Sequence, residues 1–555
     1  MSIDISLDLL YDLSQREKIR VMKELKGRIN MYFKKAVCVI SALCIVVGGM
    51  SGCTKKSQNT NINSDMPTGE ITYPIKTDET LTYWVRLANA LSTSVTNFAE
   101  TEFAKEYMRR TGINVEYKHP AQGTESESIN LLLASGELPD IIEYNWLSLN
   151  PDSAIEKKNI LALNDYIENY SPNLKKWLSE HPDINKQIVT DNGNYYVYPF
   201  IRNDDKLQST SGFMLRGDWL KELGLEVPET IDEWRTVLTA FRDKKNSTAP
   251  FGGMPTYFMG AYGISPDFYI DNGKVHYGYY EPALKEYLIE MNEWYNEELL
   301  DKNFAVMDGN QFNSDVLNNI VGAMFGAGGG TMGMFLNAKA GSEEPFELVA
   351  AKFPSKEKGK KAEFGNKQWQ YSPINGAAIT TQSKNPALAA RFLDYSYSEE
   401  GSMLNNFGIE GVSYNIIDGY PTFSEVITKN PDGLSMAQAI PLYARSANEG
   451  PFIQDVKYIE QYYALDAQKD ALVKWSDNND LNHRMPQITL TREEASRSSK
   501  IMSDVRNYCN ENTVKFILGS KSIDELDEFF DKLKGLGIEE AIDIQQAAYD
   551  RFMKR

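Results

Sequence analysis

Cysteine is scarce in this chain of 555 residues, which contains only four. Cys38 and Cys44 lie in an apolar stretch near the N-terminus, Cys53 follows that stretch, and Cys509 alone belongs to the long remainder. Cys509 therefore has no disulfide partner in the body of the protein, and the fold must rely on its hydrophobic core. Because most lone cysteines are buried and inert, we do not expect Cys509 to act as a nucleophile.

Sequence motifs for metals and nucleotides are also absent. The four histidines are far apart and show no zinc spacing, and no GxxxxGK[ST] motif occurs. The glycine-rich stretch VGAMFGAGGGTMGMF, Val321 to Phe335, lacks the order GxGxxG. We expect no cofactor and no metal, and we interpret these glycines as allowing either a close backbone approach to a ligand or a tight strand-to-helix turn.

Basic residues are fewer than acidic ones, with 58 Lys and Arg against 77 Asp and Glu, a net charge of −19. The first 52 residues carry eight basic and five acidic side chains, so the chain after them has a net charge of −22. Such acidity argues against a nucleic-acid partner, because a phosphate backbone needs a basic surface. It also favours solubility in an exported protein.

No hydrophobic run is long enough to span a membrane. The most apolar stretch, Ala36–Val47, has 12 residues, whereas a spanning helix needs about 20. Lys34 and Lys35 precede it, and small residues follow it up to Cys53. This order indicates a secretory signal over residues 31–52 with Met31 as a natural start, so residues 1–30 are either a leader or the product of a misplaced start codon.

The end of this signal, Met50-Ser51-Gly52-Cys53, resembles the lipobox of bacterial lipoproteins, with Met50 where Leu is usual. The resemblance implies that Cys53 carries a lipid such as palmitate and becomes the new N-terminus. It also implies a protein anchored to the extracellular face of the cell membrane. We interpret the polar residues 53–75 as a flexible tether.

The chain after the tether begins with a β-α-β-α-β pattern. Leu81–Leu87, Ile113–Tyr117 and Pro139–Asn145 have strand character, and two helical patterns separate them. This order predicts a parallel sheet with helices on its faces. Ligands of such sheets bind beyond the carboxyl ends of the strands, which here are Trp84–Arg86, Lys118–His119 and Asn145–Trp146.

Other local signals place helix starts and a core. Thr230 and Ser522 are each followed three residues later by Glu, which predicts two capping boxes, and Asn385-Pro386 predicts a third helix start. Trp219 and Trp234 fall at helical spacing beside apolar residues, so we expect both in the core. Aromatic residues make up 11% of the chain, including 31 Tyr. Most should be core, but aromatic rings also suit the faces of sugars.

Seven blocks of the sequence, in order, resemble the family 1 extracellular solute-binding lipoproteins of ABC importers, above all the long forms of Gram-positive bacteria. These blocks are LLLASGELPDII, ILALNDYIENYSPNL, DNGNYYVYPF, GFMLRGDWLKELGLEVPETIDEW, NPALAARFLDYSYSEEG, NFGIEGVSYN and SIDELDEFFDKLKGLGIEEAIDIQQAAYDRFMKR. The resemblance implies a periplasmic-binding-protein-like α/β fold, in which two α/β lobes are joined by a multi-strand hinge and close on a ligand. It implies residues 76–205 and 372–415 for one lobe and residues 206–371 and 416–555 for the other.

One departure from this family concerns calcium. Some long members carry a calcium loop after the TIDEW-like block, but the corresponding stretch here, FRDKKNSTAPFGG, contains only one acidic residue, Asp243. Calcium needs six to eight oxygen ligands, several of them carboxylates. We therefore expect no calcium site there.

The resemblance also implies a set of ligand-binding residues in the cleft. Aromatic side chains would stack on sugar rings, and Arg86, Asn145, Arg202 and Glu410 would bond hydroxyl groups. The full set is Trp84, Arg86, Asn145, Trp146, Arg202, Tyr257, Phe325, Trp369 and Glu410. For each of them the alternative is core packing or a surface ion pair.

The implied function is a monomeric receptor that captures a carbohydrate or another polar small solute and delivers it to the membrane subunits of an ABC permease. Two alternatives stay open at this point. A lipid-anchored glycan hydrolase or lyase would need two carboxylates at a defined separation, and no block resembles one. A signalling co-receptor would bind the solute without transporting it.

Overall fold

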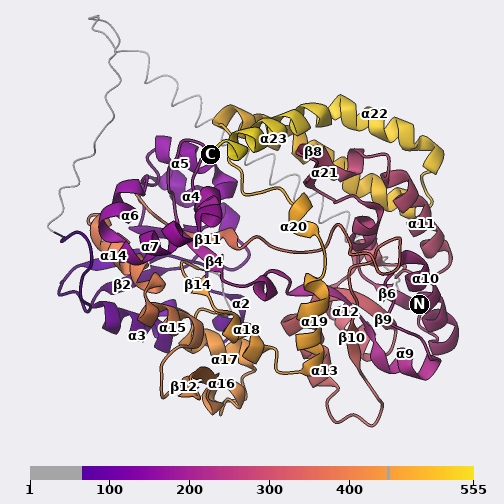
Figure 1. Cartoon of the computed structure of the whole chain (residues 1–555), viewed down its shortest axis with the longest axis horizontal. Coiled ribbons are helices and arrows are strands. Elements are labelled where there is room, and N and C mark those ends of the chain that lie inside the picture. Colours follow the sequence, from indigo (N-terminus) through magenta and orange to yellow (C-terminus); the bar gives the residue numbers. More distant parts are fainter. Residues whose placement is uncertain (1–65, 447–449) are drawn as a thin grey trace, which may run out of the picture. The chain divides into compact units, whose positions relative to one another are not determined.

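Two β-sheets organise the residues that the structure, a computed structural model, describes: 66–446 and 450–555. One sheet has six strands in the order β14-β4-β11-β3-β1-β2, and the other has four in the order β10-β5-β9-β6. We call each sheet with its covering helices lobe 1 and lobe 2 (Figure 1). The expected pair of α/β lobes is therefore confirmed, whereas the signal and Cys53 lie outside the described residues.

Lobe 1 begins with the predicted parallel strands. Its strands are β1 (Thr80–Trp84), β2 (Asn114–Lys118), β3 (Ile141–Tyr144), β4 (Tyr198–Arg202), β11 (Tyr371–Ile379) and β14 (Ile453–Gln454). β1 pairs in parallel with β2 and β3, and β14 pairs in parallel with β4, whereas β11 runs antiparallel to β3 and β4. The carboxyl ends of all strands except β11 therefore lie at one edge of the sheet.

The helices of lobe 1 come from two separate parts of the chain. They are α2 (Asn89–Ser92), α3 (Glu102–Thr111), α4 (Glu125–Ser135), α5 (Pro151–Glu156), α6 (Asn164–Tyr170), α7 (Pro172–Glu180), α8 (Pro182–Ile188), α14 (Pro386–Asp394) and α15 (Glu399–Phe407). The side chain of Asn385 accepts a bond from the amide of Leu388, as the predicted helix start requires.

Lobe 2 has the larger apolar core. Its strands are β5 (Ser211–Arg216), β6 (Ala249–Gly252), β9 (Val321–Ala327) and β10 (Leu348–Ala350), beside a hairpin of β7 (Phe268–Asp271) and β8 (Lys274–Tyr277). Trp219 and Trp234 are buried in this core, as predicted, and both expected capping boxes form. Cys509 is buried in the same core, and burial raises the pKa of its thiol to about 12.

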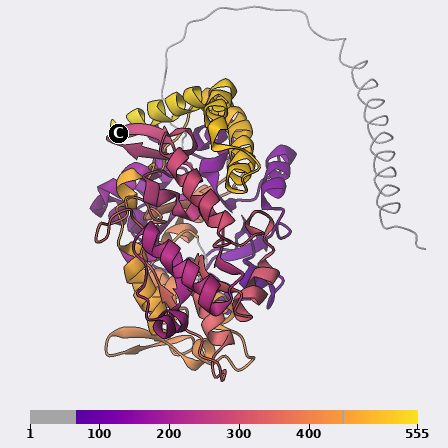
Figure 2. The same cartoon turned by 90° about the vertical axis from the view of Figure 1, so that its right-hand side faces the viewer.

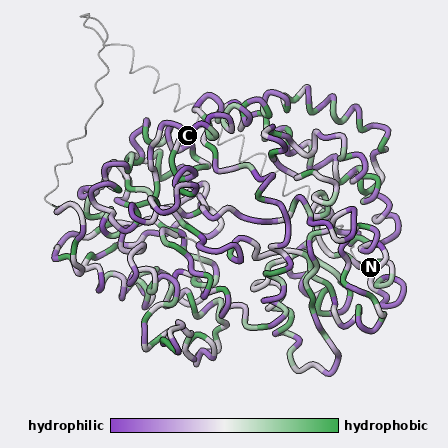
Figure 3. Tube along the Cα trace, viewed as in Figure 1, coloured by the Kyte–Doolittle hydropathy of each residue, from purple (hydrophilic) through white to green (hydrophobic). Residues whose placement is uncertain are grey.

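The helices of lobe 2 include a long C-terminal group. They are α9 (Gly217–Leu223), α10 (Ile231–Lys245), α11 (Leu284–Asn296), α12 (Gly309–Leu317), α13 (Met334–Ala338), α19 (Asp466–Ser476), α20 (Asp480–His483), α21 (Arg492–Ile517), α22 (Leu526–Leu536) and α23 (Ile538–Met553). α21 packs on α11, α23 packs on β8, and α22 packs on both α21 and α23; the three lie together, in yellow, in both Figure 1 and Figure 2. In Figure 3 apolar positions recur in the strands, and hydrophilic positions recur along the outer helices.

Three crossings connect the lobes. The chain passes from β4 to β5, returns from β10 to β11, and leaves again after β14 through α18 (Val456–Tyr462). The third crossing therefore follows Gln454, later in the chain than the implied lobe boundary between residues 415 and 416. That boundary falls within β12 (Tyr414–Ile417), which forms a separate hairpin with β13 (Tyr420–Phe423). α16 (Glu425–Thr428) and α17 (Met436–Tyr443) follow this hairpin.

Residues 66–75, expected to belong to a flexible tether, are bonded to lobe 1. A guanidinium nitrogen of Arg391 donates to the carbonyl of Pro67 at 2.6 Å, and the hydroxyl of Tyr73 donates to the carbonyl of Arg391 at 2.8 Å. The amide of Gly69 donates to the carbonyl of Asn169 at 2.9 Å. These contacts fix the point at which the chain enters the body.

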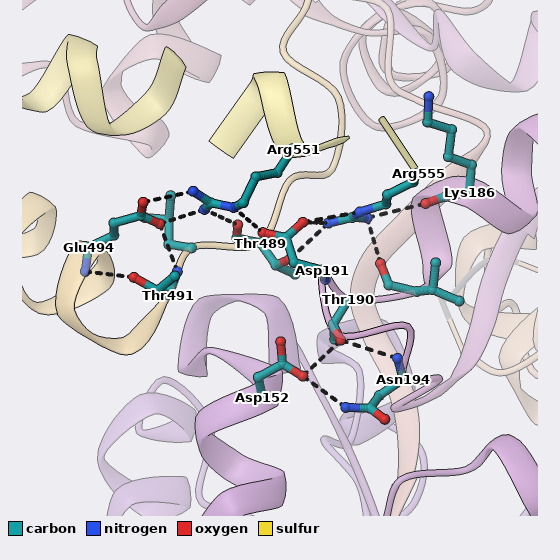
Figure 4. A network of polar contacts seen from close by, with 12 residues as sticks. Asp152, Lys186, Thr190, Asp191, Asn194, Thr489, Thr491, Glu494, Arg551 and Arg555 are labelled. Carbon is teal, nitrogen blue, oxygen red and sulfur yellow. Dashed lines mark hydrogen bonds and ion pairs between the residues drawn. The ribbon is translucent and has the colours of Figure 1, made fainter. Parts of the chain in front are cut away.

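A charged network ties the C-terminal end to lobe 1 (Figure 4). Arg551 and Arg555, at and after the end of α23, both donate to the carboxylate of Asp191, which lies between α8 and β4. Arg551 also donates to Glu494 in the first turn of α21, and Arg555 donates to the hydroxyl of Thr489 at 2.8 Å. This network, the C-terminal clamp, joins helices of lobe 2 to a turn of lobe 1.

Replacing the carboxylate of the C-terminal clamp should destabilise the protein. In Asp191→Asn, Arg555 loses its carboxylate partner and Arg551 keeps only Glu494, and the loss of one partner of a largely buried ion pair costs about 1–3 kcal/mol. We expect a lower urea midpoint with an unchanged slope. Asp183→Asn on α8, whose carboxylate is exposed, is the control and should leave the midpoint unchanged. Equal midpoints for both variants would contradict a stabilising role for the clamp.

Candidate ligand-binding site

A cavity of about 270 Å³ is lined by residues of all three crossings, among them residues of β4, α18 and the end of β9. Backbone bonds hold the crossings side by side: the amide of Arg202 donates to Gln370, that of Asn203 to Gln454, and that of Gln368 to Gln208. The lining comes from both lobes and consists of Phe200, Arg202, Leu207, Thr210, Ala327, Gly329, Gly330, Gln368, Ser446, Gln454, Tyr458, Ile459, Tyr462 and Tyr463. We call this space the hinge cavity.

Tyrosines form one wall of the hinge cavity. Tyr458 and Tyr462 are one helical turn apart on α18, and their rings stack with centroids 5.6 Å apart and planes 11° apart. The hydroxyl of Tyr463 donates to the carbonyl of Thr210 at 3.2 Å, which ties α18 to the first crossing. Burial raises the pKa of Tyr462 and Tyr463. The wall is therefore uncharged, and it combines flat apolar faces with polar edges.

The glycine-rich loop also lines the cavity and packs directly against these rings. A Cβ on Gly329 would lie 2.5 Å from the ring of Tyr462, and one on Gly328 would lie 2.6 Å from the ring of Tyr463. Any side chain at either position would displace a tyrosine. The loop forms the expected strand-to-helix turn, since β9 ends at Ala327 and α13 begins at Met334, and the groups that its backbone approaches are tyrosine rings; approach to a ligand stays a prediction. A Cβ on Gly330 would meet nothing within 4 Å.

Polar side chains complete the cavity. Nη1 of Arg202 donates to the carbonyl of Trp369 at 3.2 Å, and its guanidinium lies 5.0 Å from the ring centre of Phe200. Nε2 of Gln454 donates to the carbonyl of Ser446 at 2.7 Å. Ser446 is only 1% exposed, and its hydroxyl has no hydrogen-bond partner within the described residues. The cavity can therefore offer amides, a hydroxyl and tyrosine edges to a polar ligand.

A second cavity of about 420 Å³ lies between the turn after β3 and the C-terminal helices. Its lining includes Leu147 and Asn150 of lobe 1 and Met485, Thr489 and Met502 from the later part of the chain. Trp369 links the two linings, because its indole nitrogen donates to the carbonyl of Met485 at 2.8 Å while its own carbonyl accepts from Arg202. We call this space the helix cavity.

Of the predicted site residues, Arg202 alone lines the hinge cavity, and Trp369 bonds to it. Trp84 and Trp146 lie in one core cluster of lobe 1. Trp146 has no exposed surface, and its indole nitrogen donates to the carbonyl of Ile142 at 3.1 Å. The expectation that this ring stacks on a sugar is wrong in this conformation, because the turn after β3 folds the ring back onto the sheet.

The other predicted residues line neither cavity. Asn145 caps the turn that begins at Trp146, since its side chain accepts from the amide of Ser148 at 3.3 Å. Arg86 and Glu410 are exposed. Tyr257 and Phe325 stack on each other in lobe 2, with centroids 3.9 Å apart and planes 8° apart, and Tyr257 is 41% exposed. Ligand contact by these five residues stays a prediction.

The tyrosines of α18 were missed by sequence reasoning. They carry a local signal, since YIEQYY places three tyrosines within six residues, two of them on one helical face. Their position at a crossing carries no such signal, because it depends on the pairing of β14 with β4.

Two α/β lobes joined by three hydrogen-bonded crossings, with a cavity lined from both, define the class of hinged solute-binding proteins. The family model described as bacterial extracellular solute-binding protein matches residues 92–403, and the chain belongs to this family. It is a substrate-binding protein of ABC transporters and not an enzyme.

The following similar proteins cover between 59% and 95% of this chain. The fructooligosaccharide ABC transporter substrate-binding protein FusA of Streptococcus pneumoniae serotype 4 is 24% identical over 95% of this chain and 99% of its own. Lipoprotein LipO of Bacillus subtilis is 24% identical over 59% of this chain and 66% of its own. The crystal structure of the alginate-binding protein AlgQ2 is 26% identical and superposes with a TM-score of 0.70 over 87% of this chain and 100% of its own.

A side chain at Gly329 should destabilise the protein more than a side chain at Gly330. Gly329→Ala places a methyl group against Tyr462, and such overpacking costs about 1–3 kcal/mol. We expect a lower melting temperature and weaker ligand binding. Gly330→Ala is the matched control for stability, since its methyl group enters open space. If the two variants have equal melting temperatures, the loop does not constrain the tyrosine wall.

Removing the buried indole should lower stability rather than affinity. Trp146→Ala deletes a fully buried side chain, and such truncations cost about 3–5 kcal/mol. We expect a lower urea midpoint, whereas the fraction that stays folded should bind ligand normally. If Trp146→Ala is as stable as the wild type but binds ligand more weakly, the ring of Trp146 contacts the ligand after all.

Proposed function

We propose that this protein is a lipid-anchored extracellular receptor that captures an oligosaccharide between its lobes and delivers it to the permease of an ABC importer. The observation that carries the proposal is the hinge cavity, in which tyrosines and amides from both lobes face one space. Tyrosine rings stack on the C–H faces of sugars, and amides bond their hydroxyl groups. Relatives described as binding fructooligosaccharides and alginate support this substrate class.

Lobe closure follows from the shared lining. A ligand that touches β4 of lobe 1 and the glycine-rich loop of lobe 2 binds the closed form more tightly than the open form, and it shifts the population by that difference. The closed monomer is then the form that the membrane subunits of the permease recognise. A signalling co-receptor would bind the same ligand, but its deletion would leave uptake of the sugar unchanged.

Binding of sugars tests the proposal directly. A ligand that binds only the folded protein raises its melting temperature, so a thermal-shift screen of oligosaccharides should give at least one hit that saturates in calorimetry. Tyr462→Ala should weaken that hit by about 2–3 kcal/mol, roughly 30- to 150-fold. Tyr462→Phe keeps the ring and should lose little. A screen in which only non-sugar solutes bind would refute the carbohydrate assignment.

Anchoring depends on Cys53, which lies outside the described residues. None of the helices within residues 66–446 and 450–555 is long and apolar enough to cross a membrane. We expect Cys53→Ser to release the protein into the medium or to leave an uncleaved precursor, whereas the wild-type protein should stay with membranes after a high-salt wash. A Cys53→Ser protein that is processed and still membrane-bound would contradict lipidation at this residue.

A further inference from the structure

We propose that the ligand of the hinge cavity is a neutral oligosaccharide and that chains of uronic acids are excluded. This inference rests on the proposed function and narrows its substrate class. It depends on which charges the lining and its surroundings hold, and on one buried hydroxyl group that has no partner.

The lining of the hinge cavity holds one charged side chain, Arg202, and no carboxylate among the described residues. Its guanidinium is already engaged, because it donates to the carbonyl of Trp369 and lies over the ring of Phe200. This arrangement holds the second crossing against the first. A uronic acid chain carries a carboxylate on every ring, and one engaged guanidinium cannot neutralise several of them.

The cations next to the lining are engaged within the protein. Lys206 in the first crossing pairs with Glu460 of α18 at 2.9 Å. Arg445, next to the lining residue Ser446, pairs with Glu143 at 2.7 Å, and both side chains are buried. Lys367, next to Gln368, donates to the carbonyl of Asn478, and Lys457 lies 5.9 Å from the ring centre of Tyr420. A polyanion entering this region would therefore meet cations that already have partners.

The charges that line the helix cavity are balanced. Its lining contains one cation and one carboxylate, Arg506 and Asp267, whose charged atoms lie 3.7 Å apart. The whole chain has a net charge of −19, which repels a polyanion at long range. A uronate would therefore have to leave water without compensation, and the burial of an unpaired charge is costly.

The groups that the hinge cavity does offer suit hydroxyl groups. Ser446 is one of the lining residues, and its hydroxyl is buried and has no partner within the described residues, so a ligand hydroxyl that reached it could satisfy it. Gln368 and Gln454 present amides, which both donate and accept. The backbone at Gly330 is open, so a sugar ring can approach it without meeting a side chain.

Calorimetry with two size-matched sets of oligosaccharides tests this inference. One set is neutral, made of fructo-, xylo- and mannooligosaccharides, and the other consists of oligogalacturonates and alginate oligomers. We expect saturable binding from the neutral set, with an affinity that does not change between low and high salt, and none from the uronates. Salt-sensitive binding of the uronates would overturn the inference but leave the proposed receptor intact. Binding by neither set, with a non-sugar ligand instead, would overturn both.

Two serine variants test the buried hydroxyl. Ser446→Ala removes a group with no protein partner, so the melting temperature of the free protein should not fall, whereas affinity for the neutral ligand should drop roughly 2- to 10-fold. Ser209→Ala is the matched control: its hydroxyl is equally buried and unpartnered within the described residues, but it does not line the cavity. Equal affinities for Ser446→Ala and the wild type would overturn the role of this hydroxyl.

A gain of function gives an independent check. Gln368 is exposed, and the bond from its amide to Gln208 involves only backbone atoms. Gln368→Arg should therefore fold normally and add an unengaged cation to the lining. We expect this variant to bind an oligosaccharide with a single terminal uronic acid, which the wild-type protein rejects. Charge would not be the basis of selection if Gln368→Arg failed to bind this oligosaccharide, or if the wild-type protein bound it.

Discussion

The backbone bonds between the three crossings are the constraint on which the ligand site depends. They join Arg202 to Gln370, Asn203 to Gln454 and Gln368 to Gln208, and so bring together parts of the chain that are far apart in the sequence. Each crossing then contributes one kind of group: the first an arginine, the second an exposed amide, and the third a pair of stacked tyrosines. None of these segments could form the cavity by itself.

Hinged binding also requires that the lobes move, and the C-terminal clamp restrains that movement. Asp191 belongs to lobe 1, whereas Arg551 and Glu494 belong to helices that pack in lobe 2. A rotation of the lobes must either pivot near these ion pairs or break them. Because buried ion pairs are screened by salt less than exposed ones, the partly buried pairs of the clamp should resist such a break even at high salt.

Local patterns predicted the first strands and several helix starts, because strands and helix caps depend mainly on neighbouring residues. The parallel order of β1, β2 and β3 and the capping boxes at Thr230 and Ser522 are confirmed. The site was less predictable. Trp146 follows a strand end, but a turn bonds its indole to Ile142 and buries it. The inward position of the Trp146 ring depends on tertiary packing. The position of α18 also depends on tertiary packing, so neither could be predicted from one segment of the sequence.

The tyrosine wall can form only because the glycine-rich loop has no side chains where the tyrosine rings lie. Gly328 and Gly329 lack side chains at the points where the rings of Tyr463 and Tyr462 lie, and the carbonyl of Gly328 accepts from Gln468 at 2.8 Å. The rings are thus held between the loop and α18 before any ligand enters. Side chains that are already ordered lose little conformational entropy on binding. Tyrosines held in this way can bind a flexible, uncharged sugar chain without the strong ion pairs that an acidic ligand would require.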